Sequence, residues 1–300
     1  MELGVLTRVG FLTNNLMLVI GIKGGKTMFH KKLALLFIMT SLLTFASYPA
    51  EAQDQPLAIP TRGLVGYWTF DQIKNLKVED VVGNNDAKLQ KPTQNVVKGK
   101  FGNAMEFDGK DDFLALDPKK LPLGNSAISV SVWIFRAERG DGEDDIIWIG
   151  VNDCCNISFF VRAFTGVRRL NNQLRMGQFP NGELHGPEME LNKWHHIVAV
   201  YDGVKQNLLY LDGVEVATKE LDFEPDIQPG PIAGKKGSGA VIGSDTTQST
   251  MWSGLIDELG IYNVALTLAE VQRIFNANDL FAVEPLGKLS LTWAKIKASR

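Results

Sequence analysis

Apolar and polar residues alternate over short stretches along most of the chain, and turn-forming residues separate these stretches. In residues 128–135, aliphatic side chains occupy every second position, while serine and aromatic side chains occupy the others. A period of two is typical of a β-strand with one face in the core. We expect strands at 64–70, 86–89, 104–107, 113–116, 128–135, 146–151, 157–161, 194–201, 207–211, 214–218, 240–243 and 254–262.

One hairpin and one helix stand out in this pattern. Asp212-Gly213 joins two expected strands, and this residue pair is a strong signal for a two-residue β-turn. Helical spacing occurs near the C-terminus, where we expect Thr267 to cap a helix and Glu270 to complete its capping box. Many short strands without intervening helices predict an all-β protein, an antiparallel two-sheet sandwich or a barrel, with one short C-terminal helix.

The first 52 residues have a different pattern. Lysines at 31 and 32 precede an apolar run over 33–45, and the small-residue sequence Ala50-Glu51-Ala52 follows. This order is typical of a secretory signal peptide, so we expect a start at Met28 and cleavage after Ala52. Residues 1–27 are then an over-extended gene start. An uncleaved membrane anchor is the alternative, although the apolar run has about 13 residues and a bilayer span needs about 20.

Charge and composition exclude several classes of function for residues 53–300, the part of the chain that we expect to be exported. Without the first 52 residues, the chain has 26 basic and 32 acidic groups, a net charge of −6. We expect no nucleic-acid partner, because phosphate binding needs a basic surface. The hydrophobic fraction of 45% argues against disorder and against several membrane spans. We expect a protein that is secreted, periplasmic or held at the cell surface, with no membrane span once the signal is removed.

The expected domain map follows from these patterns. Residues 1–52 form the signal region, 53–62 a proline-containing linker, 63–278 the β-domain and 279–300 a basic tail. Cys154 and Cys155 are the only cysteines, and adjacent residues cannot link distant parts of a fold. We expect two free thiols, and a vicinal disulfide is the alternative.

Six phrases, in order along the chain, carry a family resemblance. They are GYWTFD (66–71), KFGNAMEFDG (100–109), SVSVWIF (129–135), WHHIVAVYDG (194–203), YLDG (210–213) and GLIDELGIYNVAL (254–266). Together they resemble secreted bacterial proteins with a laminin-G-like domain of the concanavalin A-like lectin/glucanase superfamily. The resemblance covers 63–278 and implies a jelly-roll sandwich of two antiparallel sheets, one of them concave.

The resemblance also implies a metal site. In superfamily members with a metal on the convex side, an acid of the last strand holds the ion, together with backbone carbonyls of the first strand and of a later turn. Carried over by position, the ligands are Asp257, Phe70 or Asp71, and Gly102, and the expected ion is a structural calcium. The alternative is that Asp257 is a buried carboxylate that accepts hydrogen bonds from the turn.

Aromatic and polar residues indicate a sugar-binding surface. Aromatic rings stack on sugar rings, and polar side chains bind the hydroxyls. The residues expected to line the concave sheet and its rim are Trp133, Phe135, Trp148, Asn152, Asn156 and Arg162. The alternative is that the aromatic residues belong to the core.

We expect no catalytic residue. A glycosidase needs two carboxylates that flank the scissile bond. Glu188 and Glu190 lie beside a proline, residues 143–145 are expected in a loop, and neither set matches the catalytic E-x-D-x-x-E run of enzymes in the superfamily. The sequence therefore predicts an exported, non-enzymatic module that binds glycan or an extracellular or cell-surface protein. A polysaccharide-degrading enzyme and a structural or adhesion module on the same fold are the alternatives.

Overall fold

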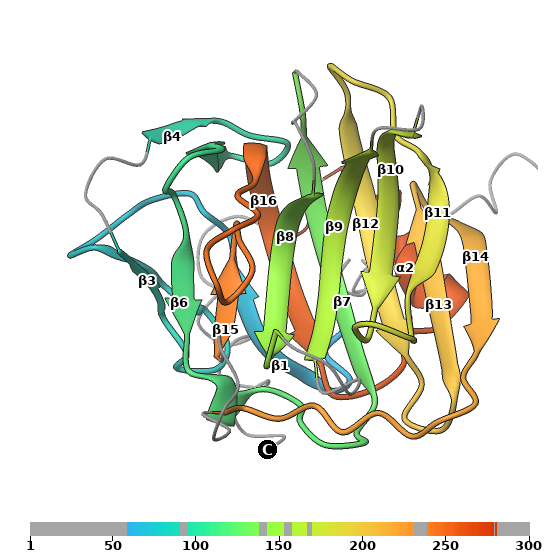
Figure 1. The fold of residues 1–300 in the computed structure, drawn as a ribbon. Coiled ribbons are helices and arrows are strands. Elements are labelled where there is room, and N and C mark those ends of the chain that lie inside the picture. The colour runs from blue at the N-terminus through green and yellow to red at the C-terminus, as the bar shows by residue number, and fades with distance from the viewer. Residues whose placement is uncertain are drawn as a thin grey trace, which may run out of the picture. The chain divides into compact units, whose positions relative to one another are not determined.

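The computed structural model describes residues 59–90, 95–137, 143–152, 158–166, 170–230, 239–278 and 280 of the 300-residue chain. These residues belong to one compact unit, within Pro56–Arg300. Their strands form two antiparallel sheets packed face to face, and the one α-helix among them lies near the C-terminal end (Figure 1). The expected all-β jelly-roll sandwich with one short C-terminal helix is confirmed.

Sheet A contains the first and the last strand. Its order is β14-β13-β12-β7-β16-β5-β4, and β1 pairs with the C-terminal half of β16. Its strands are β1 (Leu64–Trp68), β4 (Asn95–Lys98), β5 (Asn103–Asp108), β7 (Ile128–Phe135), β12 (Trp194–Tyr201), β13 (Gln206–Leu211), β14 (Val214–Glu220) and β16 (Ser253–Tyr262).

Sheet B has the order β11-β10-β9-β8-β15-β6-β3-β2. Its strands are β2 (Lys77–Val78), β3 (Ala87–Leu89), β6 (Leu114–Leu116), β8 (Glu143–Gly150), β9 (Ser158–Gly166), β10 (Leu170–Gly177), β11 (Leu184–Glu188) and β15 (Ala240–Ile242), and the 3₁₀-helix η1 (Pro118–Lys120) follows β6. The sequence pattern did not predict β10 or β11. The loop expected at 143–145 is wrong, because β8 begins at Glu143.

Alternation along the strands puts one face of each sheet into a shared core. In β7 the aliphatic residues at even positions from 128 to 134 are buried between the sheets. Ile147, Ile149 and Val161 of sheet B pack in the same core. Burial of apolar area is the main source of stability here. The residues between these positions therefore lie on the two outer faces, which are the surfaces of the sandwich that point away from the core.

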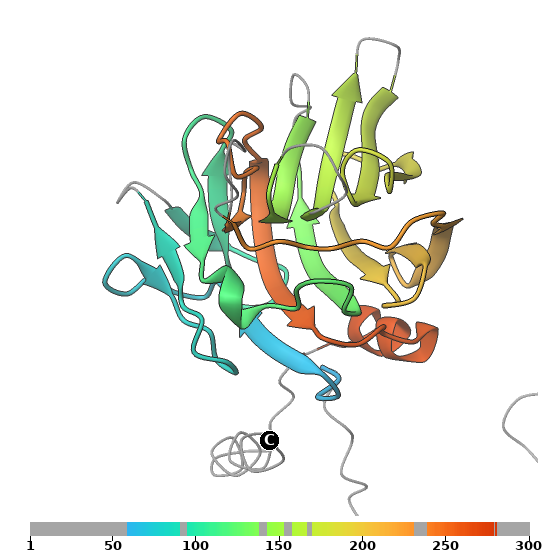
Figure 2. The same ribbon diagram turned by 60° about the horizontal axis from the view of Figure 1, so that its bottom comes forward.

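The expected hairpin and helix both form. Asp212 and Gly213 have φ of 51° and 78°, the positive values that a type I′ turn needs. Helix α2 (Leu268–Phe275) begins after Thr267, whose side chain accepts a hydrogen bond from the backbone of Glu270, while the Glu270 carboxylate accepts one from the backbone of Thr267. Val271 and Ile274 are buried against the outer face of sheet A. Figure 2 shows this helix beside the end of β16.

Several sequence-based expectations fall outside the described residues. These are the signal region 1–52 with its cleavage site, residues 53–58 of the linker, the tail apart from Leu280, and Cys154, Cys155 and Asn156. Within the described ranges, no helix combines the length and the apolar character that crossing a membrane requires.

Candidate functional site

The outer face of sheet B brings charged and aromatic side chains together. Residues that pair directly across antiparallel strands project to the same face, so the register defines rows. Two neighbouring rows are defined in this way: the charged row of His185, Arg175, Arg162 and Asp145, and the aromatic row of Phe160, Trp148 and Val241. They cross β8, β9 and β10, which lie in front of sheet A in Figure 1.

Arg162 connects the two rows. Its Nε donates to Oδ1 of Asp145 at 2.9 Å, and its Nη1 donates to Oε2 of Glu143 at 2.5 Å. The guanidinium carbon lies 4.4 Å from the ring centroid of Phe160 and 5.1 Å from that of Trp148. The rings of Trp148 and Phe160 are stacked, with their centroids 5.1 Å apart. A guanidinium held in this way over aromatic faces is fixed in one orientation.

Two carboxylates on β8 share this guanidinium. Glu143 and Asp145 are two residues apart on one strand and therefore project to the same face. Asp145 is fully buried, and its burial raises the pKa of its carboxyl group to about 7, although the charge of Arg162 and a hydrogen bond from Thr250 act in the opposite direction. Asp144, between them, forms an ion pair with buried Arg136, the residue after β7.

A second arginine extends the polar surface. Arg175 lies with its guanidinium carbon 3.8 Å from the ring centroid of Phe164. Its Nε donates to Gln173 at 3.2 Å, and its Nη1 donates to Glu183 at 3.4 Å. Phe164, Gln173 and Glu143 are half-buried, so this side of the face is open to solvent, whereas Trp148 and Phe160 have no exposed surface.

The rim of this face is ordered around Asp245, which is 1% exposed. Its carboxylate accepts hydrogen bonds from Nδ2 of Asn152 at 2.5 Å and from the backbone of Ser249 at 2.7 Å. Burial alone would raise the pKa of Asp245, but hydrogen bonds from Thr247, Ser249 and Thr250 bring it below its ordinary value. Asn152 is therefore held at the rim by a charged acceptor.

The structure divides the residues expected to bind sugar between two surfaces. Trp148, Arg162 and Asn152 lie on or beside the outer face of sheet B. Trp133 and Phe135 belong to β7 and lie on the outer face of sheet A instead, on the other side of the sandwich. Trp133 is 2% exposed and packs against Phe101, His196 and Phe275, as the core alternative would have it. Phe135 is half-buried.

Sequence reasoning missed several members of the surface on sheet B. Asp145, Phe160, Gln173 and Arg175 were not singled out as site residues. A signal was present at Arg162, which sits at an outward position of a strand that is otherwise largely apolar. It becomes readable only once 170–177 is known to be a strand paired with β9.

The residues expected to hold a metal meet around one turn. Oδ2 of Asp257 accepts hydrogen bonds from the backbone of Lys100 at 2.9 Å and of Phe101 at 3.1 Å. Oδ1 of Asp71 accepts from the backbone of Asn103 at 3.0 Å. Gly102 has a φ of 56°, and a Cβ atom there would lie 2.2 Å from Oδ1 of Asp71. Only glycine therefore lets this turn approach Asp71.

The buried carboxylate of Asp257 fits a cation. Its Oδ1 is buried and has no hydrogen-bond partner. Burial raises the pKa of the carboxyl group to about 7, and the negative charge of Asp71 acts in the same direction. A hard cation would compensate both the buried charge and the unpartnered oxygen. Phe70, which is buried beside Asp71, has a φ of 57°.

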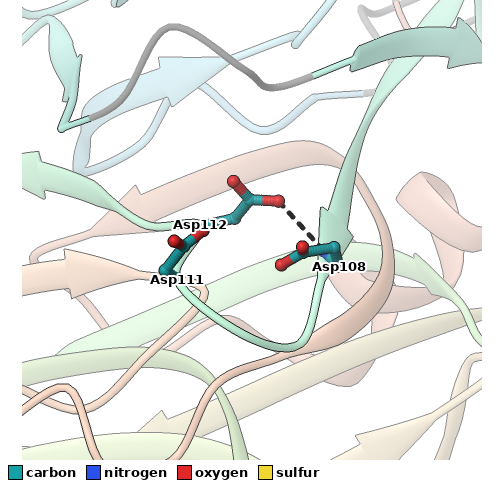
Figure 3. A group of neighbouring side chains, drawn as sticks. All are labelled: Asp108, Asp111 and Asp112. Carbon is teal, nitrogen blue, oxygen red and sulfur yellow. Dashed lines mark hydrogen bonds between the residues drawn. The ribbon is translucent and has the colours of Figure 1, made fainter.

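A second acidic group lies in the turn after β5. Asp108, Asp111 and Asp112 each offer a carboxylate oxygen, and these oxygens lie within 4.8 Å of one another (Figure 3). The carboxylate of Asp112 accepts from the backbone of Asp108 at 3.0 Å, and that of Asp108 accepts from the backbone of Lys110 at 2.9 Å. Sequence reasoning did not name this group. A calcium measurement has to separate it from Asp257.

Comparison with known proteins identifies the fold family. A family model described as the concanavalin A-like lectin/glucanases superfamily matches residues 108–272, more than half of the chain. No curated protein matches the sequence.

Solved structures resemble the sandwich at low sequence identity. Domain 4 of AbnA, an extracellular GH43 arabinanase from Geobacillus stearothermophilus in complex with arabinotriose, has 23% identity and a TM-score of 0.54, covering 71% of this chain and 98% of that domain. Trypanosoma rangeli sialidase with the inhibitor DANA has 17% identity and a TM-score of 0.53, covering 75% of this chain and 34% of the sialidase. The binding domain of Paraclostridial Mosquitocidal Protein 1 has 17% identity and a TM-score of 0.53, covering 71% of this chain and 52% of that domain. These likenesses show the fold alone.

Proposed function

This chain belongs to the concanavalin A-like lectin/glucanase superfamily, and we propose that it is a non-catalytic carbohydrate-binding module that contacts glycan through the outer face of sheet B. One observation carries the proposal. Two guanidinium groups, each fixed over an aromatic ring by hydrogen bonds to neighbouring side chains, stand in one row of this face next to half-buried Phe164, Gln173 and Glu143.

The chemistry of this face suits a sugar. A sugar ring has an apolar side that an aromatic ring can cover, and a rim of hydroxyls that planar polar groups can bind. Arg175 is already ordered by its partners, so binding at it costs little side-chain entropy, while Arg162, which is 2% exposed, would hold the surface in place from beneath. Fully buried Trp148 and Phe160 would support Arg162 from below, and the half-buried residues would make the contacts.

The test is a binding measurement on the purified chain. The probes are arabinotriose, a neutral β-1,4-linked hexose tetramer and a sialylated trisaccharide, measured by calorimetry. We expect saturable binding of one of them, and Phe164→Ala should weaken it about tenfold, or about 1.4 kcal/mol. Phe223→Ala, at another half-buried phenylalanine that packs against the core between the sheets, is the matched control and should bind like the parent. If none of the probes nor a wider polysaccharide panel binds, the proposal fails and the adhesion module becomes the better account.

A second candidate function is hydrolysis, because Glu143 and Asp145 form a carboxylate pair on one strand and burial raises the pKa of Asp145 to about 7. Glycosidases use such pairs, with one acid of raised pKa. Both carboxylates here are bound to one guanidinium, however, and Asp145 has no exposed surface from which to reach a glycosidic oxygen. We therefore propose binding without catalysis. New reducing ends after incubation with arabinan, lost in Glu143→Gln, would support the enzyme instead.

We also propose a structural calcium ion held by Asp257, Asp71 and the backbone around Phe70 and Gly102. The unpartnered Oδ1 of buried Asp257 supports this assignment. The ion would tie the turn between β4 and β5 to the last strand, and it would supply no chemistry to the glycan surface. Calcium should raise the melting temperature of the parent protein relative to chelator, and Asp257→Asn should remove that difference. Loss of the difference in Asp111→Asn, with Asp257→Asn unaffected, would assign the ion to the Asp108, Asp111 and Asp112 group.

We propose that the mature protein acts outside the cytoplasm, on glycan or on an extracellular or cell-surface protein that carries it. The support is the signal-like pattern of 28–52. Mass spectrometry of the protein recovered from the periplasm or the medium should give Gln53 as the first residue. Recovery only in the cytoplasm, with the N-terminal segment intact, would contradict export.

A further inference from the structure

Within the part of the chain that the structure describes, the outer face of sheet A is covered over only part of its length. Helix α2 seals the part that contains Trp133 and His196, and both of these residues are almost fully buried. Two residues further along β7, at Phe135, the side chains on this face become partly exposed. Figure 2 shows the helix at the end of sheet A where β16 finishes, away from the end where β16 begins.

A single row of side chains crosses this open end. Trp194 of β12 pairs with Phe135 of β7, Phe135 pairs with Leu255 of β16, Leu255 pairs with Glu106 of β5, and Glu106 pairs with Asn95 of β4. Paired residues project to the same face, so these five residues, which we call the five-strand row, form one line across the sheet. Trp194, Phe135 and Leu255 are half-buried, whereas Glu106 and Asn95 are exposed.

The row has an apolar part and a polar part. The rings of Trp194 and Phe135 lie 5.7 Å apart at 52°, and Leu255 continues the apolar surface. At the other end, Nδ2 of Asn95 donates to Oε2 of Glu106 at 3.4 Å. Rings that can cover an apolar ring face, next to an amide and a carboxylate that can bind hydroxyls, match the two kinds of surface that a sugar chain presents.

We propose that the five-strand row is a second glycan-contact surface, on the opposite side of the sandwich from the outer face of sheet B. This inference rests on the proposed function, in that both surfaces take a glycan. Neighbouring strands are about 4.8 Å apart, so five positions span roughly 20 Å, enough for a short run of linked sugars lying across the strands. The ligand class is a sugar chain with exposed ring faces.

The size of the row argues for a glycan rather than a protein. A stable protein interface buries about 1,200–2,000 Å² and has an apolar centre. Three half-buried apolar side chains in a line, ending in exposed Glu106 and Asn95, offer far less apolar surface than that. A sugar chain needs only a narrow strip of rings and a few hydrogen-bonding groups.

Two surfaces on opposite sides let one molecule hold two glycan chains. Simultaneous engagement of a polymer by both faces would raise the apparent affinity well above that of either face alone. The module would then bridge polysaccharide chains, which a protein with one surface does not do.

Calorimetry with the three oligosaccharides tests the row by stoichiometry. The parent should bind two molecules of the recognised oligosaccharide, and Trp194→Ala should bind one. Glu106→Gln, which keeps the shape of an exposed side chain and carries little folding risk, should weaken one of the two sites several-fold. Phe164→Ala should weaken the other site about tenfold, Trp194→Ala with Phe164→Ala should keep only that weakened site, and Phe223→Ala should keep both.

Each other result has a defined meaning. If the parent has one site, and this site is weakened by Phe164→Ala but unchanged in Trp194→Ala and Glu106→Gln, the five-strand row is overturned. The proposed function then stands. One site that is lost in Trp194→Ala and untouched in Phe164→Ala moves the proposed binding surface to sheet A. Absence of all binding overturns both. Concentration-dependent dimerisation that Trp194→Ala abolishes would identify the row as a protein contact and overturn the glycan assignment.

Discussion

The two outer faces of the sandwich bury their central side chains in different ways. Under helix α2, the face of sheet A is mainly aromatic: Trp133, His196 and Phe275 pack ring on ring, and burial lowers the pKa of His196 to about 3. The outer face of sheet B instead holds Arg162 and Asp145, both buried and ion-paired. Beneath its own helix, a face can be filled by stacked rings and a neutral histidine. Among the described residues, no helix covers the outer face of sheet B, and this face holds its charged side chains in fixed ion pairs.

The difference makes sheet B the more fragile face to single substitutions, and Arg162→Ala should have the largest effect. The change leaves Asp145 buried without its guanidinium, and removing one partner of a buried pair costs about 3–5 kcal/mol. Urea unfolding followed by circular dichroism measures the loss. Arg162→Ala combined with Asp145→Asn should recover part of the stability. A loss below about 1 kcal/mol in the single variant would mean that the pair is effectively solvated.

Ile274→Ala should have the next largest effect, on the face of sheet A. Ile274, on the buried side of α2, is 3% exposed, and deleting a buried aliphatic side chain costs about 2–4 kcal/mol. Leu268→Ala, in the same helix at 44% exposure, is the matched control and should change stability by less than about 0.5 kcal/mol. Glycan binding on sheet B should be unchanged in both. Equal losses in the two variants would show that α2 does not seal this face.

The pH dependence of stability should have opposite signs for Asp145 on sheet B and His196 on sheet A. Folded Asp145, with its pKa raised by burial to about 7, keeps its proton where the unfolded chain has lost it, so its contribution is lost as pH rises from about 4 through 7. Folded His196 stays neutral where the unfolded chain takes up a proton, so its contribution is lost as pH falls from about 6.5 to 3.

Urea unfolding at several pH values between 4 and 8 separates these contributions. Asp145→Asn should make stability rise more steeply with pH than in the parent, and His196→Phe should make it rise less steeply. Asp257→Asn, tested in chelator, should act like Asp145→Asn, because burial raises its pKa as well. Identical slopes for Asp145→Asn and His196→Phe would contradict the contrast between a protonated buried Asp145 on sheet B and a neutral buried His196 on sheet A.

Thr267→Ala should have the smallest effect. It removes the capping box at the start of α2, and losing a threonine cap costs about 1 kcal/mol. Thr247→Ala at the rim of sheet B is a matched exposed threonine, and there Asn152 and Ser249 continue to donate to Asp245. Differential scanning calorimetry should show a smaller shift for Thr247→Ala. The reverse order would make the rim more important for stability than the helix cap.

Much of the fold follows from local patterns in the sequence. The Asp212-Gly213 turn, the Thr267 cap and the alternation in β7 each depend on neighbouring residues alone, and all were predicted. Strand β10 was not predicted, because its outward positions hold Gln173 and Arg175 and few apolar residues occupy its inward positions. The first residues of β8 were also missed, because their burial depends on distant partners. Asp144 and Asp145 are buried beside arginines that come from other parts of the chain.

The candidate site was less predictable than the fold. Alternation places Trp133 and Trp148 on outward positions of their strands, but it does not say that the strands belong to different sheets. It also does not say that both indoles are buried, because what covers an outward side chain comes from distant parts of the chain. The four residues carried over for a metal do meet at one turn, and the binding of calcium there remains a prediction.

The ends of the described domain have a practical consequence for its use as a building block. Ile59, before the first strand, and Leu280, after helix α2, belong to the same apolar cluster on the outer side of sheet A. Both ends of the described domain are therefore anchored on the outer side of sheet A. A carrier protein joined at either end would be attached on the side of the sandwich opposite the outer face of sheet B.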